Sequence, residues 1–157
     1  MVETVTMESA SFRAAPQRFE AGTPPTTQTV ALHAAVDYLG AIGMDRIAEH
    51  EHRLAGRLIE GLSRIQGVRL IGPAENTDRL AAVSVVVDGV HPHDVGQVLD
   101  AAGIAVRVGH HCAQPVHRRY GATASTRASA YLYTTEAEID AFLDALDGVR
   151  LYFKIAG

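Results

Sequence analysis

The stretch from Ala81 to Val87, AAVSVVV, decides the fold. It is almost wholly apolar and rich in β-branched residues, which is typical of a central, well-buried strand. Working outward, residues 68–71 (VRLI) predict a neighbouring strand on the upstream side. Residues 104–108 (IAVRV) and 126–132 (TRASAYL) predict two more strands downstream. The second half of the chain is therefore expected to build a small sheet around residues 81–87.

Helical patterns alternate with these strands. Apolar residues recur at helical spacing over residues 29–42 and 45–66, which predicts two helices. Pro92 is suited to the first turn of a third helix, and Thr135 with Glu138 forms a capping box for a last one. This order predicts an α/β (α+β-like) sandwich, in which helices pack on a small, mostly antiparallel sheet.

The composition fits one globular domain. The chain has 157 residues, of which 47% are hydrophobic and 20% charged, and its formal net charge of -4 gives no basic surface for nucleic acid. No apolar run reaches the roughly 18 residues of a membrane helix, and the N-terminus shows no signal-peptide pattern. Because Cys112 is the only cysteine, no disulfide framework is possible, and a cytoplasmic location is expected.

The first residues look like the end of another domain. Residues 2–7 (VETVTM) alternate between apolar and polar side chains, which predicts a half-buried strand. Such a strand needs a partner, and none is expected nearby in the sequence. The breaker-rich residues 22–27 (GTPPTT) then predict a loop before the first helix.

The densest polar cluster is the string from Arg107 to Pro115, RVGHHCAQP. Cys112 follows two histidines there, in a loop expected between a strand and a short helical stretch. The thiolate is the reactive form of cysteine, and neighbouring cations favour it. Cys112 is therefore a candidate nucleophile. The alternative is a buried, inert cysteine beside two loop histidines.

Two further features of the sequence allow more than one interpretation. Arg127 opens an otherwise apolar strand, so it is either a snorkelling edge residue or a guanidinium fork for a carboxylate. The histidines of the second half, together with Cys112, are candidate zinc ligands, although none of the usual ligand-pair spacings occurs. The members of this histidine cluster are His91, His93, His110, His111 and His117.

The Arg107–Pro115 string resembles the catalytic-cysteine loop of the SufS-type (group II) cysteine desulfurases. These are pyridoxal 5'-phosphate enzymes of the class V aminotransferase family, with fold type I. Residues 18–24 (RFEAGTP), 91–95 (HPHDV) and 127–129 (RAS) resemble segments of the same family in the same order. The resemblance extends from about Val2 to Val149, and its R-x-G-H-H-C string is specific.

The resemblance also implies how the chain is organised. Residues 1–24 match the tail of the large cofactor-binding domain and the inter-domain segment, and residues 25–157 match the C-terminal small domain. The family's cofactor-anchoring lysine lies in a Ser-x-His-Lys segment that is missing here, and the only lysine, Lys154, matches nothing catalytic. We therefore expect these 157 residues to be inactive alone.

The family chemistry implies roles for individual residues. L-cysteine loses its sulfur to the catalytic thiolate, which gives L-alanine and a persulfide, and Cys112 matches that thiolate. Arg127 resembles the residue that binds the substrate carboxylate, and Arg107 resembles a second active-site arginine. His110 and His111 belong to the active-site loop. Thr23 resembles the threonine that reaches the cofactor phosphate of the neighbouring subunit, so a homodimer is implied.

The string HPHDV resembles the branch of the family that passes sulfur to a zinc-dependent, SufU-like acceptor for iron–sulfur cluster assembly. In that branch, the histidine that matches His93 joins the zinc of the acceptor; no metal site is expected within this chain. The alternatives are a selenocysteine lyase or another class V pyridoxal-phosphate enzyme. A different class of alternative is a stand-alone zinc-binding or interaction module that uses the histidine cluster.

Overall fold

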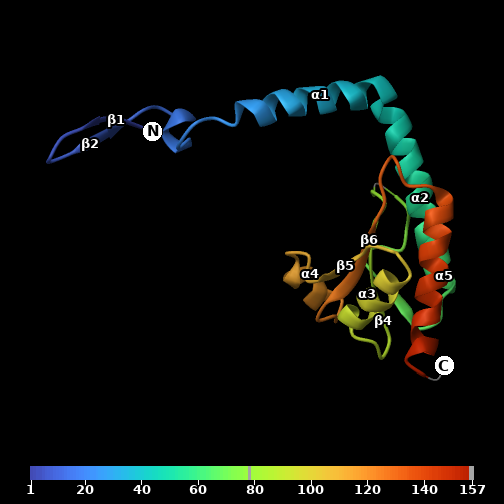
Figure 1. Ribbon diagram of the computed structural model, residues 1–157. Helices are drawn as coiled ribbons and strands as arrows, with labels where there is room; N and C mark the ends of the chain where they lie inside the picture. The colour runs from blue at the N-terminus through green and yellow to red at the C-terminus, as the bar shows by residue number, and fades with distance from the viewer. Residues whose placement is uncertain (78, 156–157) are drawn as a thin grey trace. The chain divides into compact units, whose positions relative to one another are not determined.

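The computed structural model of the chain describes residues 1–77 and 79–155 (Figure 1). Contacts within the chain define two compact units, residues 1–43 and 44–157, and each is described by itself. The division at residue 24 concerns the domains of a larger protein and stays a prediction.

The first unit begins with a β-hairpin. Strand β1 (Val2–Val5) pairs antiparallel with strand β2 (Ala10–Phe12). The turn between them is closed by Thr6, whose hydroxyl accepts hydrogen bonds from the backbone N–H groups of Glu8 and Ser9 at 3.2 and 3.0 Å. The expectation that the first strand has no nearby partner was wrong, because a four-residue turn brings the chain straight back.

A short 3₁₀ helix η1 (Gln17–Phe19) and helix α1 (Thr26–Ile42) complete this unit. Helix α1 begins three residues before the predicted start and ends at Gly43, which adopts a φ of 97°. None of its side chains is buried in the described structure, although several are large and apolar. The exposed apolar side chains are Val30, Leu32, Val36 and Tyr38.

The second unit contains the predicted small antiparallel sheet. Its strand order is β3 (Val68–Ile71), β4 (Ala82–Val87), β6 (Ser125–Ser129) and β5 (Arg107–Gly109), and every neighbouring pair is antiparallel. The central position predicted for residues 81–87 is confirmed. Burial alternates along β4, however, and only its odd-numbered valines are fully buried, so the helices cover one face of the sheet more completely than the other.

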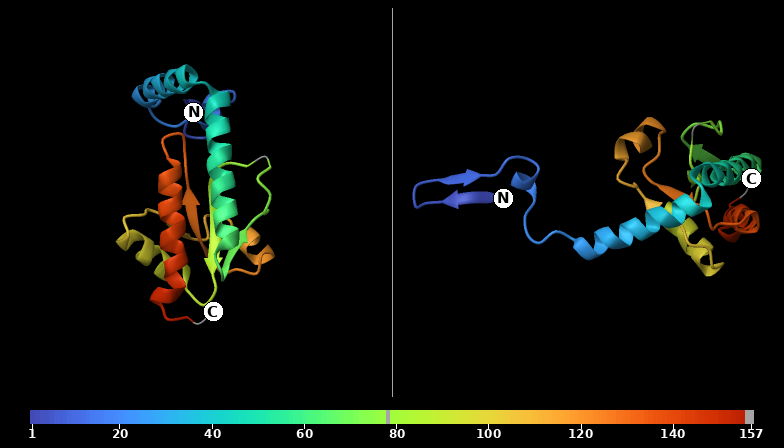
Figure 2. Two further views of the ribbon diagram at one scale, coloured as in Figure 1. Left: turned by 90° about the vertical axis from the view of Figure 1, so that its right-hand side faces the viewer. Right: turned by 90° about the horizontal axis from the view of Figure 1, so that it is seen from above.

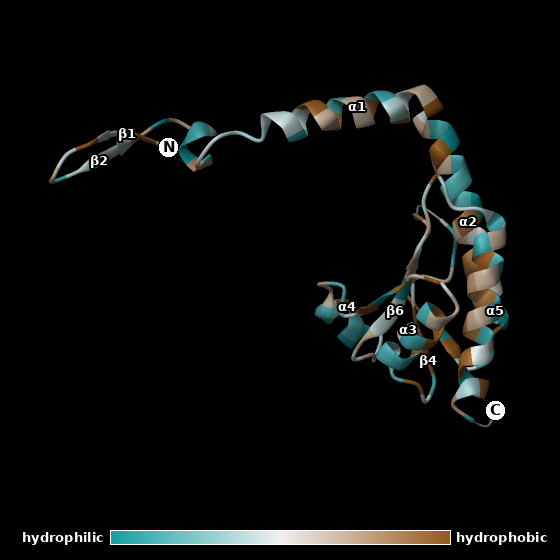
Figure 3. Ribbon diagram, viewed as in Figure 1, coloured by the Kyte–Doolittle hydropathy of each residue, from teal (hydrophilic) through white to brown (hydrophobic). Residues whose placement is uncertain are grey.

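Three helices form the core with that face. They are α2 (Met44–Arg64), α3 (Pro92–Ala101) and α5 (Glu136–Tyr152), and α2 and α5 run side by side (Figure 2). Figure 3 shows hydrophobic residues along α2 and α5. On the outer side, Arg57 of α2 binds both carboxylate oxygens of Asp140 on α5 at 2.6 Å each. Among the described residues, no helix has the length and apolar character needed to cross a membrane.

Two predicted strand boundaries shift by three residues. Strand β5 begins at Arg107 rather than at residue 104, and β6 ends at Ser129 rather than at 132. Residues 131–134 form a turn instead, closed by a hydrogen bond from the Thr134 N–H to the Tyr131 carbonyl at 2.9 Å. Both expectations followed apolar runs, whereas a strand ends where its pairing ends. Arg107 is the first residue of β5 that pairs with β6, and Ser129 pairs with Ala82, the first residue of β4.

A glycine fixes how closely helix α3 approaches the edge strand. A Cβ atom added at Gly96 would lie 2.8 Å from Cγ1 of Val108 on β5, which is closer than real Cβ contacts. The missing side chain therefore lets α3 pack directly against β5. Because β5 leads into the polar loop, this contact sets where the loop begins.

Candidate functional site

Cys112 lies in the loop between β5 and the short helix α4 (Gln114–Arg119), and its side chain is exposed. His111 and Cys112 have φ values of 53° and 57°, so two consecutive non-glycine residues adopt the left-handed conformation. Each such residue costs about 1–2 kcal/mol. This turn is closed by a 2.8 Å hydrogen bond from the Ala113 N–H to the His110 carbonyl. The thiol on this turn is exposed, which does not fit the interpretation of a buried, inert cysteine.

Two further side chains lie beneath this loop. His117 on α4 is only 3% exposed, and Ser125 at the start of β6 is fully buried. The Ser125 hydroxyl lies 2.8 Å from Nε2 of His117 and 3.1 Å from Nε2 of His111. Nδ1 of His117 lies 3.0 Å from the Ala113 carbonyl oxygen. A continuous hydrogen-bonded chain therefore links the loop to the sheet.

The surroundings of His111 lower the pKa of its imidazole, which favours the neutral form. Burial is the largest cause that lowers its pKa, and the nearby positive charge of Arg127 lowers it further, against an opposing contribution from Ser125. The positive charge of Arg107 acts in the same direction as burial. Nδ1 of His111 is buried and has no hydrogen-bond partner among the described residues.

Two arginines lie opposite each other next to the loop. Arg107 on β5 and Arg127 on β6 are cross-strand partners in the antiparallel register. Nε of Arg127 donates to the Ser129 hydroxyl at 3.1 Å, and neither guanidinium pairs with a carboxylate among the described residues. Like charges directly opposite each other in a sheet are unfavourable. The pair therefore forms a positively charged place that an anionic group would stabilise.

His91 and His93 lie at the beginning of helix α3, and their roles differ. Nδ1 of His91 accepts a hydrogen bond from the His93 backbone N–H at 3.3 Å, so His91 is the N-cap of the helix. The two rings stack with centroids 5.6 Å apart and an interplanar angle of 3°. The ring of His93 is exposed and hydrogen-bonds to no described residue.

The structure thus brings together some of the predicted site residues and leaves others apart. His110 lies exposed in the cysteine loop, with its ring edge-on to His117 at 6.2 Å. Thr23 lies exposed in the first unit, in the loop before α1. Among residues 1–77 and 79–155, no three His, Cys, Asp or Glu side chains form a group that could hold a metal ion, so the zinc-module interpretation finds no prepared site.

Sequence reasoning missed Ser125 and the role of His117. His117 counted only as a candidate zinc ligand, although its position four residues after Ala113 on a short helix places its ring under the loop. Ser125 gave no signal, because its importance comes from the packing of β6 beneath residues that are distant in the sequence.

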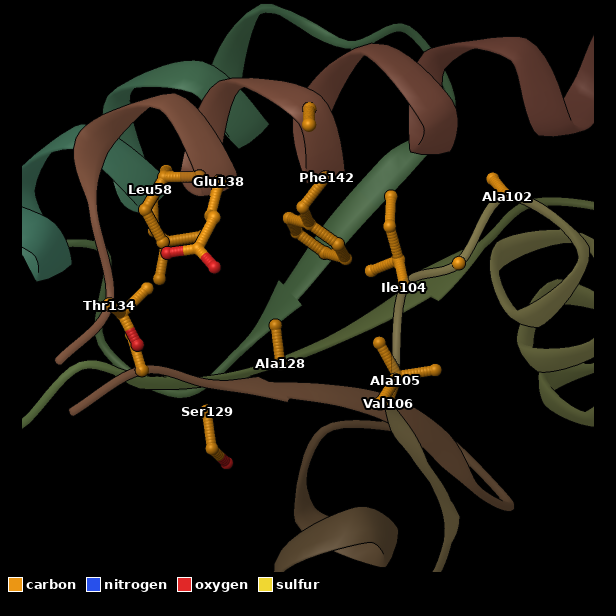
Figure 4. Close-up of a pocket in the computed structure, with 14 residues that line it drawn as sticks. Leu58, Ala102, Ile104, Ala105, Val106, Ala128, Ser129, Thr134, Glu138 and Phe142 are labelled. Atoms are coloured by element: carbon orange, nitrogen blue, oxygen red, sulfur yellow. The ribbon is translucent and has the colours of Figure 1, made fainter.

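A cavity of about 360 Å³ lies elsewhere in this unit, between α5, β6 and the chain before β5 (Figure 4). Its walls are mostly apolar and include Ile104, Ala128 and Phe142. Its one carboxylate, Glu138, accepts hydrogen bonds at 2.7 Å from the Thr135 N–H and at 2.9 Å from the Thr135 hydroxyl, as part of the capping box. None of the predicted site residues lines this cavity, so the chemistry is better placed at the cysteine loop.

The chain is similar to known proteins over nearly its whole length. Residues 1–142 match the family described as aminotransferase class-V. The chain is 56% identical over 153 residues to a probable cysteine desulfurase of Streptomyces coelicolor, which covers 98% of this chain and 37% of that protein. It is 59% identical over 140 residues to probable cysteine desulfurase 2 of Mycobacterium leprae, which covers 89% of this chain and 34% of that protein.

A solved structure with the same fold is the apo cysteine desulfurase from Thermococcus onnurineus, with a TM-score of 0.82 and 38% identity. The match covers 94% of this chain and 37% of that one. The chain therefore spans little more than a third of the length of the relatives it matches.

Proposed function

Because the chain belongs to the class-V aminotransferase family, we propose that it is the C-terminal part of a SufS-type cysteine desulfurase. The whole protein would remove sulfur from L-cysteine, release L-alanine and hold the sulfur as a persulfide on Cys112. The observation that carries this proposal is the exposed Cys112 thiol on a strained loop that follows Arg107. Arg107 and its cross-strand partner Arg127 form no ion pair with a carboxylate of the described residues. The names of the similar proteins support the same substrate.

In this proposal, the Cys112 thiolate donates an electron pair to the sulfur of bound L-cysteine. A sulfur–sulfur bond forms while the bond between that sulfur and the substrate Cβ breaks. The electron pair of the broken bond stays on the substrate carbon, which takes up a proton and becomes the methyl group of alanine. The loop keeps the Cys112 thiol exposed, while the neighbouring His111 is hydrogen-bonded to Ser125 beneath the loop.

Arg127 binds the substrate carboxylate in this scheme. A guanidinium holds a carboxylate through two parallel hydrogen bonds, which fixes the amino acid in direction as well as in place. Arg107, the cross-strand partner of Arg127 on β5, adds a second positive charge next to the bound carboxylate. Binding an anion here also removes the repulsion between the two guanidinium groups.

The family implies pyridoxal 5'-phosphate as cofactor, and bound cofactor would withdraw electrons from the substrate carbon. The residues of this chain do not fit a complete cofactor site. Lys154, the only lysine in the sequence, is exposed just after helix α5 and does not belong to the cysteine loop. We assign the anchoring lysine to residues outside this chain and give Thr23 the contact with the cofactor phosphate of the neighbouring subunit in a homodimer.

His93 is the proposed contact for a SufU-like, zinc-containing sulfur acceptor that serves iron–sulfur cluster assembly in the cytoplasm. A neutral imidazole is a good zinc ligand. The start of α3 supports this assignment. His91 caps the helix, and the exposed ring of His93 is free to bind a zinc ion of the acceptor.

The test is made on the whole protein that contains this chain, loaded with cofactor. Alanine release from L-cysteine is measured together with the mass of the Cys112 peptide, which gains one sulfur atom in the proposed intermediate. Cys112→Ser is expected to abolish both signals. If L-selenocysteine is turned over while L-cysteine is not, the selenocysteine lyase alternative replaces this proposal. Stoichiometric zinc in the purified protein would favour the zinc-binding module.

A further inference from the structure

The residues on both sides of Cys112, His111 and Ala113, are held by hydrogen bonds that connect them to His117. On the C-terminal side, the Ala113 carbonyl oxygen lies 3.0 Å from Nδ1 of His117. On the N-terminal side, Nε2 of His111 lies 3.1 Å from the Ser125 hydroxyl, which lies 2.8 Å from Nε2 of His117. The thiol itself stays exposed between these anchors.

The Ala113 carbonyl oxygen determines where the protons lie on His117, Ser125 and His111. A carbonyl oxygen can only accept, so Nδ1 of His117 carries a proton and donates to Ala113. In a neutral ring, Nε2 of His117 is then an acceptor, and it takes the single proton of the Ser125 hydroxyl.

The same reasoning fixes the second imidazole. Because the Ser125 proton already points to His117, Nε2 of His111 has to donate to the Ser125 oxygen. Nδ1 of His111 then carries no proton, which agrees with a buried atom that has no acceptor nearby. Burial and neighbouring positive charge lower the pKa of His111, which is consistent with a neutral ring.

We infer that His117 is a positioning residue for the cysteine loop: it orients the Ser125 hydroxyl, thereby fixes His111 as the Nε2–H tautomer, and holds both neighbours of Cys112. The loop needs such support because His111 and Cys112 both adopt the left-handed conformation. The importance of this anchoring for sulfur transfer rests on the proposed function, whereas the anchoring itself does not.

Two substitutions of His117 each remove one of its two hydrogen bonds, the one to the Ala113 carbonyl or the one to Ser125. In His117→Asn, the side-chain amide lies near the place of Nδ1 and keeps the bond to the Ala113 carbonyl, but it cannot reach Ser125. In His117→Gln, the amide oxygen lies near the place of Nε2 and accepts from Ser125, while the bond to Ala113 is lost. Thr126→Val is the matched control, since it removes a buried hydroxyl from the next residue of β6, which bonds to the Pro92 carbonyl and not to the loop.

The measurement is nitrogen-15 NMR of the imidazole groups in the whole 157-residue chain. We expect Nδ1–H for His117 and Nε2–H for His111. In His117→Asn and in Ser125→Ala, the Nε2–H proton of His111 should exchange with solvent about tenfold faster, since one supporting hydrogen bond is lost. His117→Gln and Thr126→Val should leave that exchange close to its original rate.

Finding His117 as the Nε2–H tautomer would overturn the inference. So would an exchange rate at His111 that is the same in His117→Asn and Thr126→Val. These outcomes do not depend on catalysis, because they are read without substrate or cofactor. Conversely, if the tautomers are as inferred while Cys112→Ser keeps full desulfurase activity, the anchoring stands and the proposed function fails.

Discussion

Arg107 and Arg127 lie directly opposite each other across β5 and β6, with no carboxylate paired to either among the described residues. A fold selected for stability alone would replace one of them, because like charges at this spacing repel. Substitution of one of these arginines is therefore expected to impair substrate binding without lowering the free energy of unfolding.

Arg127→Gln removes one of the two opposed charges. We expect the free energy of unfolding of the chain to stay the same or to rise by about 0.2–1 kcal/mol, as measured in urea. In the whole enzyme, the KM for L-cysteine should rise at least about tenfold, because a charged hydrogen-bond pair to the carboxylate is lost. Arg119→Gln, on the outside of α4, is the control for removing a positive charge. A fall in stability with unchanged KM would mean that Arg127 is structural.

His91 and His93 should respond differently to substitution by alanine. His91→Ala removes an N-cap and should lower the free energy of unfolding by about 0.5–2 kcal/mol. His93→Ala should leave both stability and basal cysteine turnover unchanged, but it should abolish the stimulation by a zinc-loaded acceptor. Turnover with and without the acceptor is the measurement, and stimulation that survives in His93→Ala would exclude His93 as the contact.

Two glycines in helices provide a matched pair. Gly96→Ala places a Cβ atom 2.8 Å from Val108 and should lower the free energy of unfolding by about 1–3 kcal/mol. Gly148→Ala on α5 meets nothing within 4 Å and should raise it by about 0.5–1 kcal/mol, because alanine favours the helix. Urea unfolding of both variants checks this. Equal effects would show that α3 does not depend on close approach to β5.

The capping box of α5 makes part of the stability depend on pH. Hydrogen bonds from the Thr135 N–H and hydroxyl lower the pKa of Glu138 below its ordinary value of 4.5. A carboxylate with a lowered folded-state pKa contributes its stabilisation above the unfolded-state pKa and loses it as the pH falls through the folded-state value. Glu138→Gln should therefore be less stable than the parent at pH 7, and the difference should shrink below about pH 4.5. A difference that is constant from pH 7 to about pH 3 would contradict this.

The parts of the fold that the sequence predicts well are those with a strong periodic pattern. The run at residues 81–87 and the stripe on α2 appear where they were expected, because burial on the same side of a strand or helix imposes a period on the sequence. The partner of the first strand was missed because β2 is only three residues long and carries too few residues to show alternation.

The candidate site, too, could be predicted only where a local sequence pattern reveals it. The string around Cys112 could be found from the sequence, since its charged and nucleophilic residues are adjacent. Ser125 and the tautomers of His111 and His117 could not, because they depend on which hydroxyl the sheet places beneath the loop. Short-range patterns carry no information about such long-range hydrogen bonds.

The strand order of the sheet also determines when the cysteine loop can be secured during synthesis. Strand β5 leaves the ribosome before β6, yet β6 is the only strand that pairs with it in the described part of the chain. The loop also takes its support from Ser125 at the start of β6. At about 5–20 residues per second, the roughly 20 residues from the end of β5 to the end of β6 take about 1–4 s to make. During that interval the loop has only its local hydrogen bonds, within the turn and between His117 and Ala113, so the thiol is less restrained in the nascent chain than in the finished fold.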